Sequence, residues 1–279
     1  MRTFLVATDF SKAGHNACLY GAELAKAFHA RLILFSAYQQ VPVPLSDAPV
    51  IQTPEDMKDF VQQRLEDESR AINPANEFQI ETICRDGTAA NMILGIARLK
   101  QAELIIAGMK APRVKMQRLL GSTVTALARR TSIPLMVIPE TAKYAGLPNL
   151  ALATEKDIAP DTDTRAMDVL LEIGKTYHSR LFLVRIAKNR YHEMFESLNR
   201  PFYLSRATKL LDPQYECIES KDVPSALNEF IGERHIDMLV LLPQEHSLLD
   251  KWFVKSISRS VVFGVQVPVL ILPHLYGIP

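Results

Sequence analysis

The sequence predicts an α/β protein with two tandem, doubly wound, parallel five-stranded sheets. The chain has 279 residues, a length that suits two domains of average size. Short apolar runs alternate with segments of helical periodicity, as in parallel sheets whose strands are connected by helices. The same order of segments occurs twice along the chain, which indicates an internal duplication.

The duplication rests on four pairs of similar segments. They occur in the same order in both halves, at offsets between 134 and 149 residues: 4–9 with 150–155, 29–35 with 178–184, 102–106 with 236–240, and 132–139 with 266–273. Pro, Gly and polar residues interrupt the pattern between Glu140 and Pro148. We therefore expect one domain at residues 1–141 and a second at residues 147–279.

Five short runs predict the strands of the first half. The first is a continuous apolar run, as expected of a strand buried on both faces, and the third is partly alternating. In chain order they cover residues 4–8, 32–37, 78–84, 104–107 and 135–138. In a doubly wound sheet, ligands bind beyond the carboxyl ends of the strands, where the strand order reverses. The segments that follow the strands are therefore the candidates for a site.

Four segments with helical periodicity connect these strands. Ser11 is suited to cap the first helix, and Thr53 begins a capping box with Pro in the first turn of the second. The first helix follows Ser11 and reaches Phe28, and the others are predicted over residues 54–69, 88–100 and 122–130.

The composition excludes several classes of protein. Lys and Arg total 32 against 31 for Asp and Glu, so the net charge of +1 gives no global field that attracts nucleic acid or an acidic membrane. No run approaches the roughly 18 apolar residues of a membrane span. The three cysteines are widely spaced, and the N-terminus lacks the apolar run of a signal peptide. We expect a cytoplasmic protein with no nucleic-acid or membrane partner.

Asp9 is the first candidate site residue. The segment Thr8-Asp9-Phe10-Ser11 directly follows the first predicted strand. A carboxylate at this position can accept hydrogen bonds from a sugar hydroxyl or from the edge of a base. The same residues also suit a simpler role, in which Asp9 and Ser11 cap the following helix. The sequence leaves both roles open.

The segment after the fourth predicted strand is the second candidate site. It runs from Gly108 to Gly121, and Gly121-Ser122-Thr123 then opens a helix whose free N–H groups suit an anion. The charged residues between the two glycines are all basic: Lys110, Arg113, Lys115 and Arg118. This pattern favours a loop that binds a polyphosphate. The alternative is a solvated basic loop that leads into a capped helix.

These segments resemble the universal stress protein family. The spacing Gly-x2-Gly-x9-Gly-Ser/Thr after the fourth strand carries the resemblance, together with Thr8-Asp9-Phe10-Ser11, the turn Arg85-Asp86-Gly87 and the closing run at residues 133–139. The resemblance covers the first half and, more weakly, the second. It implies the tandem form of the family, with an adenine nucleotide alpha hydrolase-like fold.

The resemblance also implies a ligand and the residues that hold it. Members of the family divide into ATP binders and members that bind no nucleotide. In the binders, the acid after the first strand and the end of the second strand hold adenine and ribose, and the glycine loop holds the phosphates. The matching positions are Asp9, Ala37, Gly108, Gly121 and Ser122. ATP with Mg²⁺ is therefore the implied cofactor, with Lys110 and Thr123 beside its phosphates.

The sequence departs from the family pattern in both halves. Ala111 stands where the second glycine of the loop belongs, and a positive φ there would cost an alanine about 1 kcal/mol. An alignment of the two closing runs places Leu242, Glu245 and Lys255 opposite Gly108, Ala111 and Gly121, and only Ser256 matches, opposite Ser122. We expect the second domain to be a copy that binds no nucleotide.

Three functions are compatible with these observations. The first is a stress protein that binds an adenine nucleotide and acts through its conformation or a partner, and the second is a nucleotide-free scaffold. The third, an enzyme, is the least supported. The sequence has no Walker motif, no GxGxxG or GxSxG, no zinc spacing and no nucleophile–base pair, so we expect ATP hydrolysis to be slow at most.

The closing runs also predict an association. Family members pair through their last strand, so we expect Pro134–Ile138 and Pro268–Leu272 to pair inside one chain as an internal pseudo-dimer. The sequence leaves open whether two chains then form a homodimer.

Overall fold

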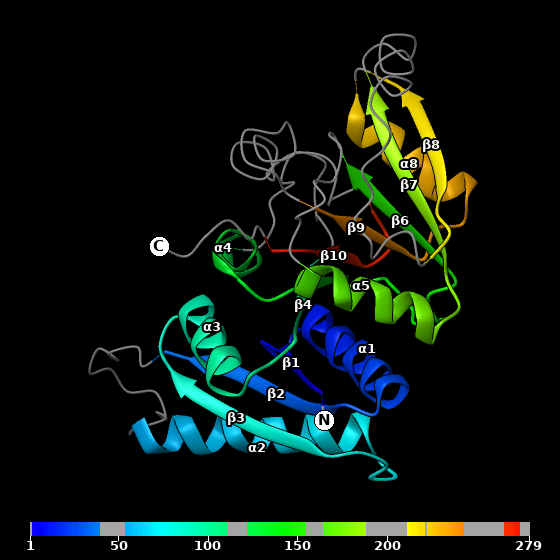
Figure 1. Cartoon of the computed structure of the whole chain (residues 1–279). Coiled ribbons are helices and arrows are strands. Elements are labelled where there is room, and N and C mark those ends of the chain that lie inside the picture. Colours follow the sequence, from blue (N-terminus) through cyan, green and yellow to red (C-terminus); the bar gives the residue numbers. More distant parts are fainter. Residues whose placement is uncertain are drawn as a thin grey trace.

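The protein is built around one large, mostly parallel sheet with helices on both faces (Figure 1). The computed structural model describes residues 2–39, 54–110, 122–154, 164–187, 211–220, 222–242 and 265–273. Within these ranges the helices are α1 (Lys12–Phe28), α2 (Pro54–Ile72), α3 (Ala89–Leu99), α4 (Ser122–Arg130), α5 (Thr164–Thr176) and α8 (Val223–Glu233). The strands are β1 (Thr3–Ala7), β2 (Arg31–Tyr38), β3 (Ile80–Asp86), β4 (Leu104–Met109), β5 (Leu135–Pro139), β6 (Asn149–Thr154), β7 (Arg180–Ala187), β8 (Gln214–Glu219), β9 (Met238–Leu241) and β10 (Val269–Ile271).

The ten strands lie in the order β3-β2-β1-β4-β5-β10-β9-β6-β7-β8. Each half contributes five parallel strands in the same doubly wound order, which confirms the predicted α/β class. The two predicted sheets are halves of one sheet. They join where β5 and β10 pair antiparallel, with Met136 opposite Leu270.

The elements of the first half lie where the sequence predicts them. All five strands begin and end within two residues of their predicted limits, because the central strands are apolar on both faces and leave little freedom in assignment. Helix α1 begins after Ser11, whose hydroxyl accepts a hydrogen bond from the Gly14 N–H at 3.2 Å. It ends at His29 in the left-handed conformation, and His178 has the same conformation in the second half. Thr53 lies outside the described residues.

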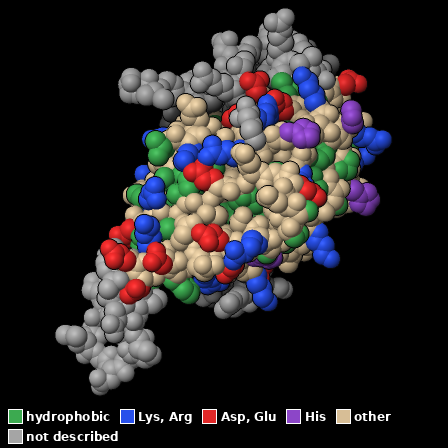
Figure 2. All heavy atoms as spheres, turned by 90° about the horizontal axis from the view of Figure 1, so that it is seen from below, with side chains coloured by type: hydrophobic (Ala, Val, Ile, Leu, Met, Phe, Trp, Pro, Cys, Tyr) green, Lys and Arg blue, Asp and Glu red, His purple; other side chains and the backbone are tan. Residues whose placement is uncertain are grey.

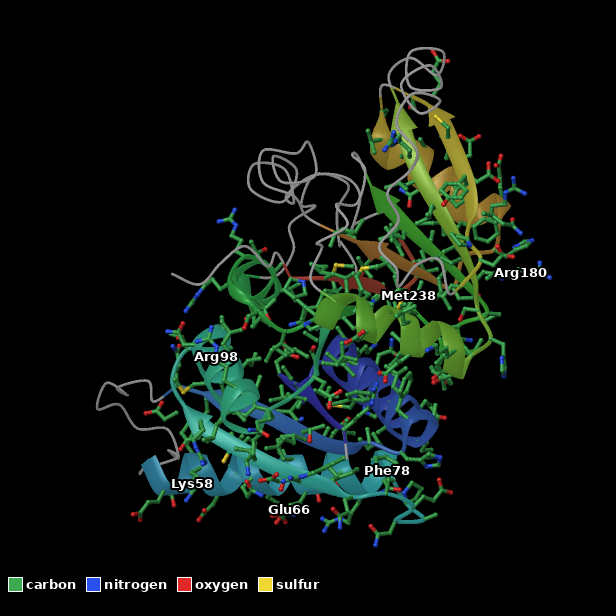
Figure 3. All side chains as sticks on the ribbon, viewed as in Figure 1. Lys58, Glu66, Phe78, Arg98, Arg180 and Met238 are labelled. Carbon is green, nitrogen blue, oxygen red and sulfur yellow. The ribbon has the colours of Figure 1, made fainter. Side chains whose placement is uncertain are left out.

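The helices divide between the two faces of the sheet. One face packs against α1, α2 and α5, and the opposite face packs against α3, α4 and α8. Each core continues across both halves. Met238 of β9 is fully buried, whereas Lys58 of α2 and Arg98 of α3 are exposed (Figure 3). On the face seen in Figure 2, acidic and basic side chains are interspersed. No helix in the described ranges has the length and apolar character needed to cross a membrane.

Helices α1 and α5 lie side by side where the two halves meet (Figure 1). The Tyr144 and Tyr177 hydroxyls are 2.6 Å apart, and the Tyr144 ring also packs edge-on against Tyr20. Arg2, before β1, forms an ion pair with Glu172 of α5. The halves are therefore in contact through side chains as well as through the sheet.

Candidate functional site

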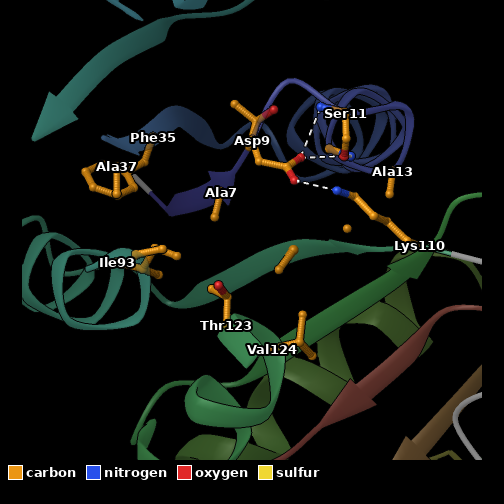
Figure 4. Close-up of a pocket in the computed structure, with 15 residues that line it drawn as sticks. Ala7, Asp9, Ser11, Ala13, Phe35, Ala37, Ile93, Lys110, Thr123 and Val124 are labelled. Carbon is orange, nitrogen blue, oxygen red and sulfur yellow. Dashed lines mark hydrogen bonds and ion pairs between the residues drawn. The ribbon is translucent and has the colours of Figure 1, made fainter. Parts of the chain in front are cut away.

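A cavity of about 120 Å³ lies at the carboxyl ends of β1 and β4 (Figure 4). The strand order reverses between these two neighbouring strands, so the cavity occupies the switch point at which doubly wound sheets bind ligands. Strand ends, the first turns of α1 and α4, and α3 provide its lining: Ala7, Thr8, Asp9, Ser11, Ala13, Gly14, Phe35, Ala37, Ala89, Ile93, Ala107, Gly108, Lys110, Thr123 and Val124.

Small residues at three neighbouring strand ends create the hollow. Ala7 of β1 lies opposite Ala107 of β4 in the sheet register, and Ala37 lies near the end of β2. The larger apolar walls come from Phe35, which is fully buried, and from Ile93 of α3. Sequence reasoning found Ala37 and missed the other lining alanines. For Ala7 and Ala107, the recurrence of alanine near strand ends was the available signal.

An ion pair spans the rim of this cavity. The Lys110 ammonium at the end of β4 lies 3.1 Å from Oδ2 of Asp9, after β1 (Figure 4). Asp9 also accepts hydrogen bonds from the Ser11 N–H, at 3.0 Å, and from the Ser11 hydroxyl. Partial burial raises the pKa of the Asp9 carboxyl, but the hydrogen bonds from Ser11 and the neighbouring Lys110 outweigh it, so the pKa is lowered. Asp9 is therefore ionised at neutral pH.

The turn between β1 and α1 fixes the direction of Asp9. Phe10 has a left-handed backbone with φ of 57°, and its N–H donates to the Thr8 hydroxyl at 3.0 Å. The Arg64 guanidinium of α2 lies 4.5 Å from the centre of the Phe10 ring, which holds the turn from outside. Of the two capping residues considered from the sequence, only Ser11 caps α1. Asp9 faces the cavity.

Gly108 lines the cavity, and its lack of a side chain is required by packing. A Cβ atom at this position would lie 2.2 Å from the carbonyl oxygen of Ala13. The first turn of α1 therefore approaches β4 so closely that only glycine fits. The sequence suggests a glycine that admits a ligand, and the structure adds this second reason for it.

The other predicted site residues differ in whether they line the cavity. Ala37 and Thr123 line the cavity, as does Lys110. Ser122 opens α4 with an exposed side chain and is not among the lining residues. Gly121, Ala111 and the cations at 113, 115 and 118 lie outside the described residues, as do residues 40–53.

The second half differs at the equivalent position. Ala107 lies opposite Ala7, and Leu241 lies opposite Ala153, so the register confirms that Leu242 corresponds to Gly108. Leu242 is only 6% exposed and belongs to the core on the α1 and α5 face. In the first half, the backbone of α1 occupies the equivalent space. The switch point of the second half is therefore packed differently.

Comparisons with known proteins agree with this architecture. Residues 1–139 match the model of the universal stress protein family. A universal stress protein from Archaeoglobus fulgidus DSM 4304 has a similar structure, with a TM-score of 0.70 and 15% identity over 96% of this chain and 97% of that chain. A functionally unknown protein from Pseudomonas aeruginosa PAO1 gives a TM-score of 0.62 and 13% identity over 98% and 92% of the two chains. No curated protein matches the sequence.

Proposed function

Because this chain belongs to the universal stress protein family, in its tandem form, we propose that the cavity of its first half binds an adenine nucleotide. One observation carries the proposal: the cavity combines an apolar interior with a rim that presents a carboxylate and an ammonium group 3.1 Å apart. A nucleotide has the matching parts, which are a flat apolar base, a sugar with hydroxyl donors and an anionic phosphate.

Each part of the ligand has a matching region of the site. Phe35, Ile93 and Val124 offer apolar surface to the base. Asp9 accepts hydrogen bonds from hydroxyl or amino groups, and Thr123 stands in the first turn of α4, where free N–H groups favour phosphate. A cavity of 120 Å³ is smaller than the roughly 300 Å³ of a typical ligand pocket. It therefore takes the base, and the phosphates extend along the rim beside Lys110, with Mg²⁺ bound to them when the ligand is ATP.

The proposed role is binding, with hydrolysis slow at most. Asp9 is held by Ser11 and Lys110, and its lowered pKa makes it a weak general base. Stress adaptation would then depend on a conformational or partner response to the bound nucleotide. The alternative is a nucleotide-free scaffold, which the Asp9–Lys110 pair favours because it satisfies both charges without a ligand.

We also propose that residues 1–141 and 147–279 are two domains that form an internal pseudo-dimer. The antiparallel pairing of β5 with β10 and the contacts of Tyr144 with Tyr177 support this arrangement. Only the first domain would bind nucleotide, because Leu242, Glu245 and Lys255 stand opposite Gly108, Ala111 and Gly121 in the second half.

Calorimetric titration of the nucleotide-stripped full chain with ATP and Mg²⁺ tests the proposal. Thr123→Glu places a negative charge at the helix start, which suits α4 but repels phosphate, so we expect a loss of affinity of tenfold or more. Thr125→Glu is the matched control, since it adds the same charge to the same helix outside the cavity lining.

Saturable binding that Thr123→Glu weakens and Thr125→Glu leaves intact supports the nucleotide site. An absence of heat with the wild-type chain at millimolar ATP contradicts it and leaves the scaffold as the function.

A further inference from the structure

We propose that Lys110 makes the site selective for ligand charge, so that a nucleotide is bound in preference to the neutral nucleoside. The inference rests on the proposed nucleotide function. It concerns how a ligand replaces the Asp9–Lys110 ion pair at the rim of the cavity. In the structure, Lys110 is paired with the carboxylate of Asp9, the group that a ligand's hydroxyl or amino donors would use. A ligand donor that takes the place of the ammonium at Oδ2 therefore displaces Lys110.

Asp9 stays in position when Lys110 leaves it. Two hydrogen bonds from Ser11, from its N–H and its hydroxyl, hold the carboxylate, and Ser11 is itself fixed as the cap of α1. Lys110 is held less firmly, since its flexible side chain is 65% exposed and the described ranges give its ammonium no other partner than Asp9. The carboxylate is thus the fixed element of the rim and the ammonium is the mobile one.

The displacement has different consequences for charged and neutral ligands. An exposed ion pair contributes little net stability, so a ligand opens it readily. A nucleotide gives donors to Asp9 and a phosphate to Lys110, and both charges are again paired. A neutral nucleoside gives donors to Asp9 and no anion to Lys110, so it breaks the ion pair without replacing it. Lys110 therefore favours the nucleotide and opposes the nucleoside.

Calorimetric titration of the wild-type chain and of the Lys110→Met variant, each with adenosine and with AMP, tests this selectivity. The wild-type chain is expected to bind AMP at least tenfold more tightly than adenosine, because only AMP forms a charge-assisted hydrogen bond with Lys110. In Lys110→Met, AMP affinity falls about tenfold, whereas adenosine affinity is unchanged or rises by up to about fivefold because Asp9 is no longer paired. Lys58→Met changes an exposed lysine of α2 and is the control. It is expected to keep the wild-type ratio of AMP affinity to adenosine affinity.

The outcomes separate this inference from the proposed function. If Lys110→Met lowers the affinities for adenosine and AMP by the same factor, or if the wild-type chain binds both ligands equally, the selectivity is refuted while the nucleotide site stands. If the wild-type chain binds neither ligand, the proposed function fails and the inference fails with it. A cooperative thermal unfolding transition of ligand-free Lys110→Met shows that the variant is folded. Raising the salt concentration should weaken AMP binding and leave adenosine binding unchanged or slightly stronger, because salt also screens the Asp9–Lys110 pair.

Discussion

Lys110 and Asp9 are 101 positions apart in the sequence, yet the Lys110 ammonium lies 3.1 Å from the Asp9 carboxylate. The pair connects the ends of β4 and β1 at the mouth of the cavity. We predict that Lys110→Met raises the pKa of Asp9, because the lysine charge is one of the causes that lower it. NMR titration of the Asp9 carboxyl carbon measures this shift directly. An identical pKa in the variant would mean that the ion pair does not form in solution.

The same pair predicts how stability depends on pH. The folded-state pKa of Asp9 is lowered from 3.8, so the carboxylate contributes stability above that value and the contribution is lost as pH falls through the folded-state pKa. Because both side chains are largely exposed, we expect Lys110→Met to be less stable than wild-type by at most about 1 kcal/mol at pH 7. Urea unfolding at pH 7 and at pH 2 checks this. A difference that persisted at a pH where Asp9 is protonated would have another origin.

Gly108→Ala is predicted to destabilise the protein by about 1–3 kcal/mol or more. The added methyl group would lie 2.2 Å from the carbonyl oxygen of Ala13, and the first turn of α1 would have to move. Gly95→Ala is the matched control, since Gly95 lies in α3 with nothing within 4 Å of the added methyl group. We expect that change to stabilise the helix by about 0.5–1 kcal/mol. Urea unfolding of both variants would show opposite signs, and equal effects would argue against the close contact.

The tyrosine pair between the halves is predicted to be coupled. Burial raises the pKa of both phenols, so the Tyr144 and Tyr177 hydroxyls stay protonated and one donates to the other at 2.6 Å. Tyr144→Phe leaves a half-buried hydroxyl without its partner, and we expect a loss of about 0.5–1.5 kcal/mol. The double variant with Tyr177→Phe should lose no more than either single variant. Strictly additive losses in this double-mutant cycle would rule out the hydrogen bond.

The pairing of β5 with β10 predicts slow hydrogen exchange in β5. This strand lies inside the ten-stranded sheet, whereas β3, its control in the same half, lies at an edge. Amides of β5 should therefore exchange only through extensive unfolding, and those of β3 should exchange earlier. Mass-spectrometric exchange resolves the two segments. Equally fast exchange would indicate that the halves separate in solution and that β5 is also an edge.

The sequence predicted the fold well because its signals are local. The continuous apolar runs of β1, β4 and β5 have few other structural solutions, and the cap at Ser11 is set by neighbours three residues away. The resemblance to the universal stress protein family also indicated which terminal strands would meet, and β5 and β10 do pair.

The lining of the candidate cavity was predicted only in part, because its geometry is not local. Asp9 and Thr123 were found from their positions after β1 and at the start of α4. The ion pair of Asp9 with Lys110 depends on which strands are neighbours in the sheet. Likewise, the packing need for Gly108 comes from the approach of α1, and Ile93 reaches the cavity only because α3 crosses the sheet beside it.

The number of nucleotides bound per chain tests the proposed division between the two halves most directly. Equilibrium dialysis of the nucleotide-stripped protein against saturating radiolabelled ATP with Mg²⁺ counts them. One nucleotide per chain, reduced in Thr123→Glu and retained in Thr125→Glu, is the predicted result, because the cavity lies in the first half and the second half has a buried Leu242 in place of Gly108. Two nucleotides per chain would contradict the assignment of the second half, and none would contradict the nucleotide site itself.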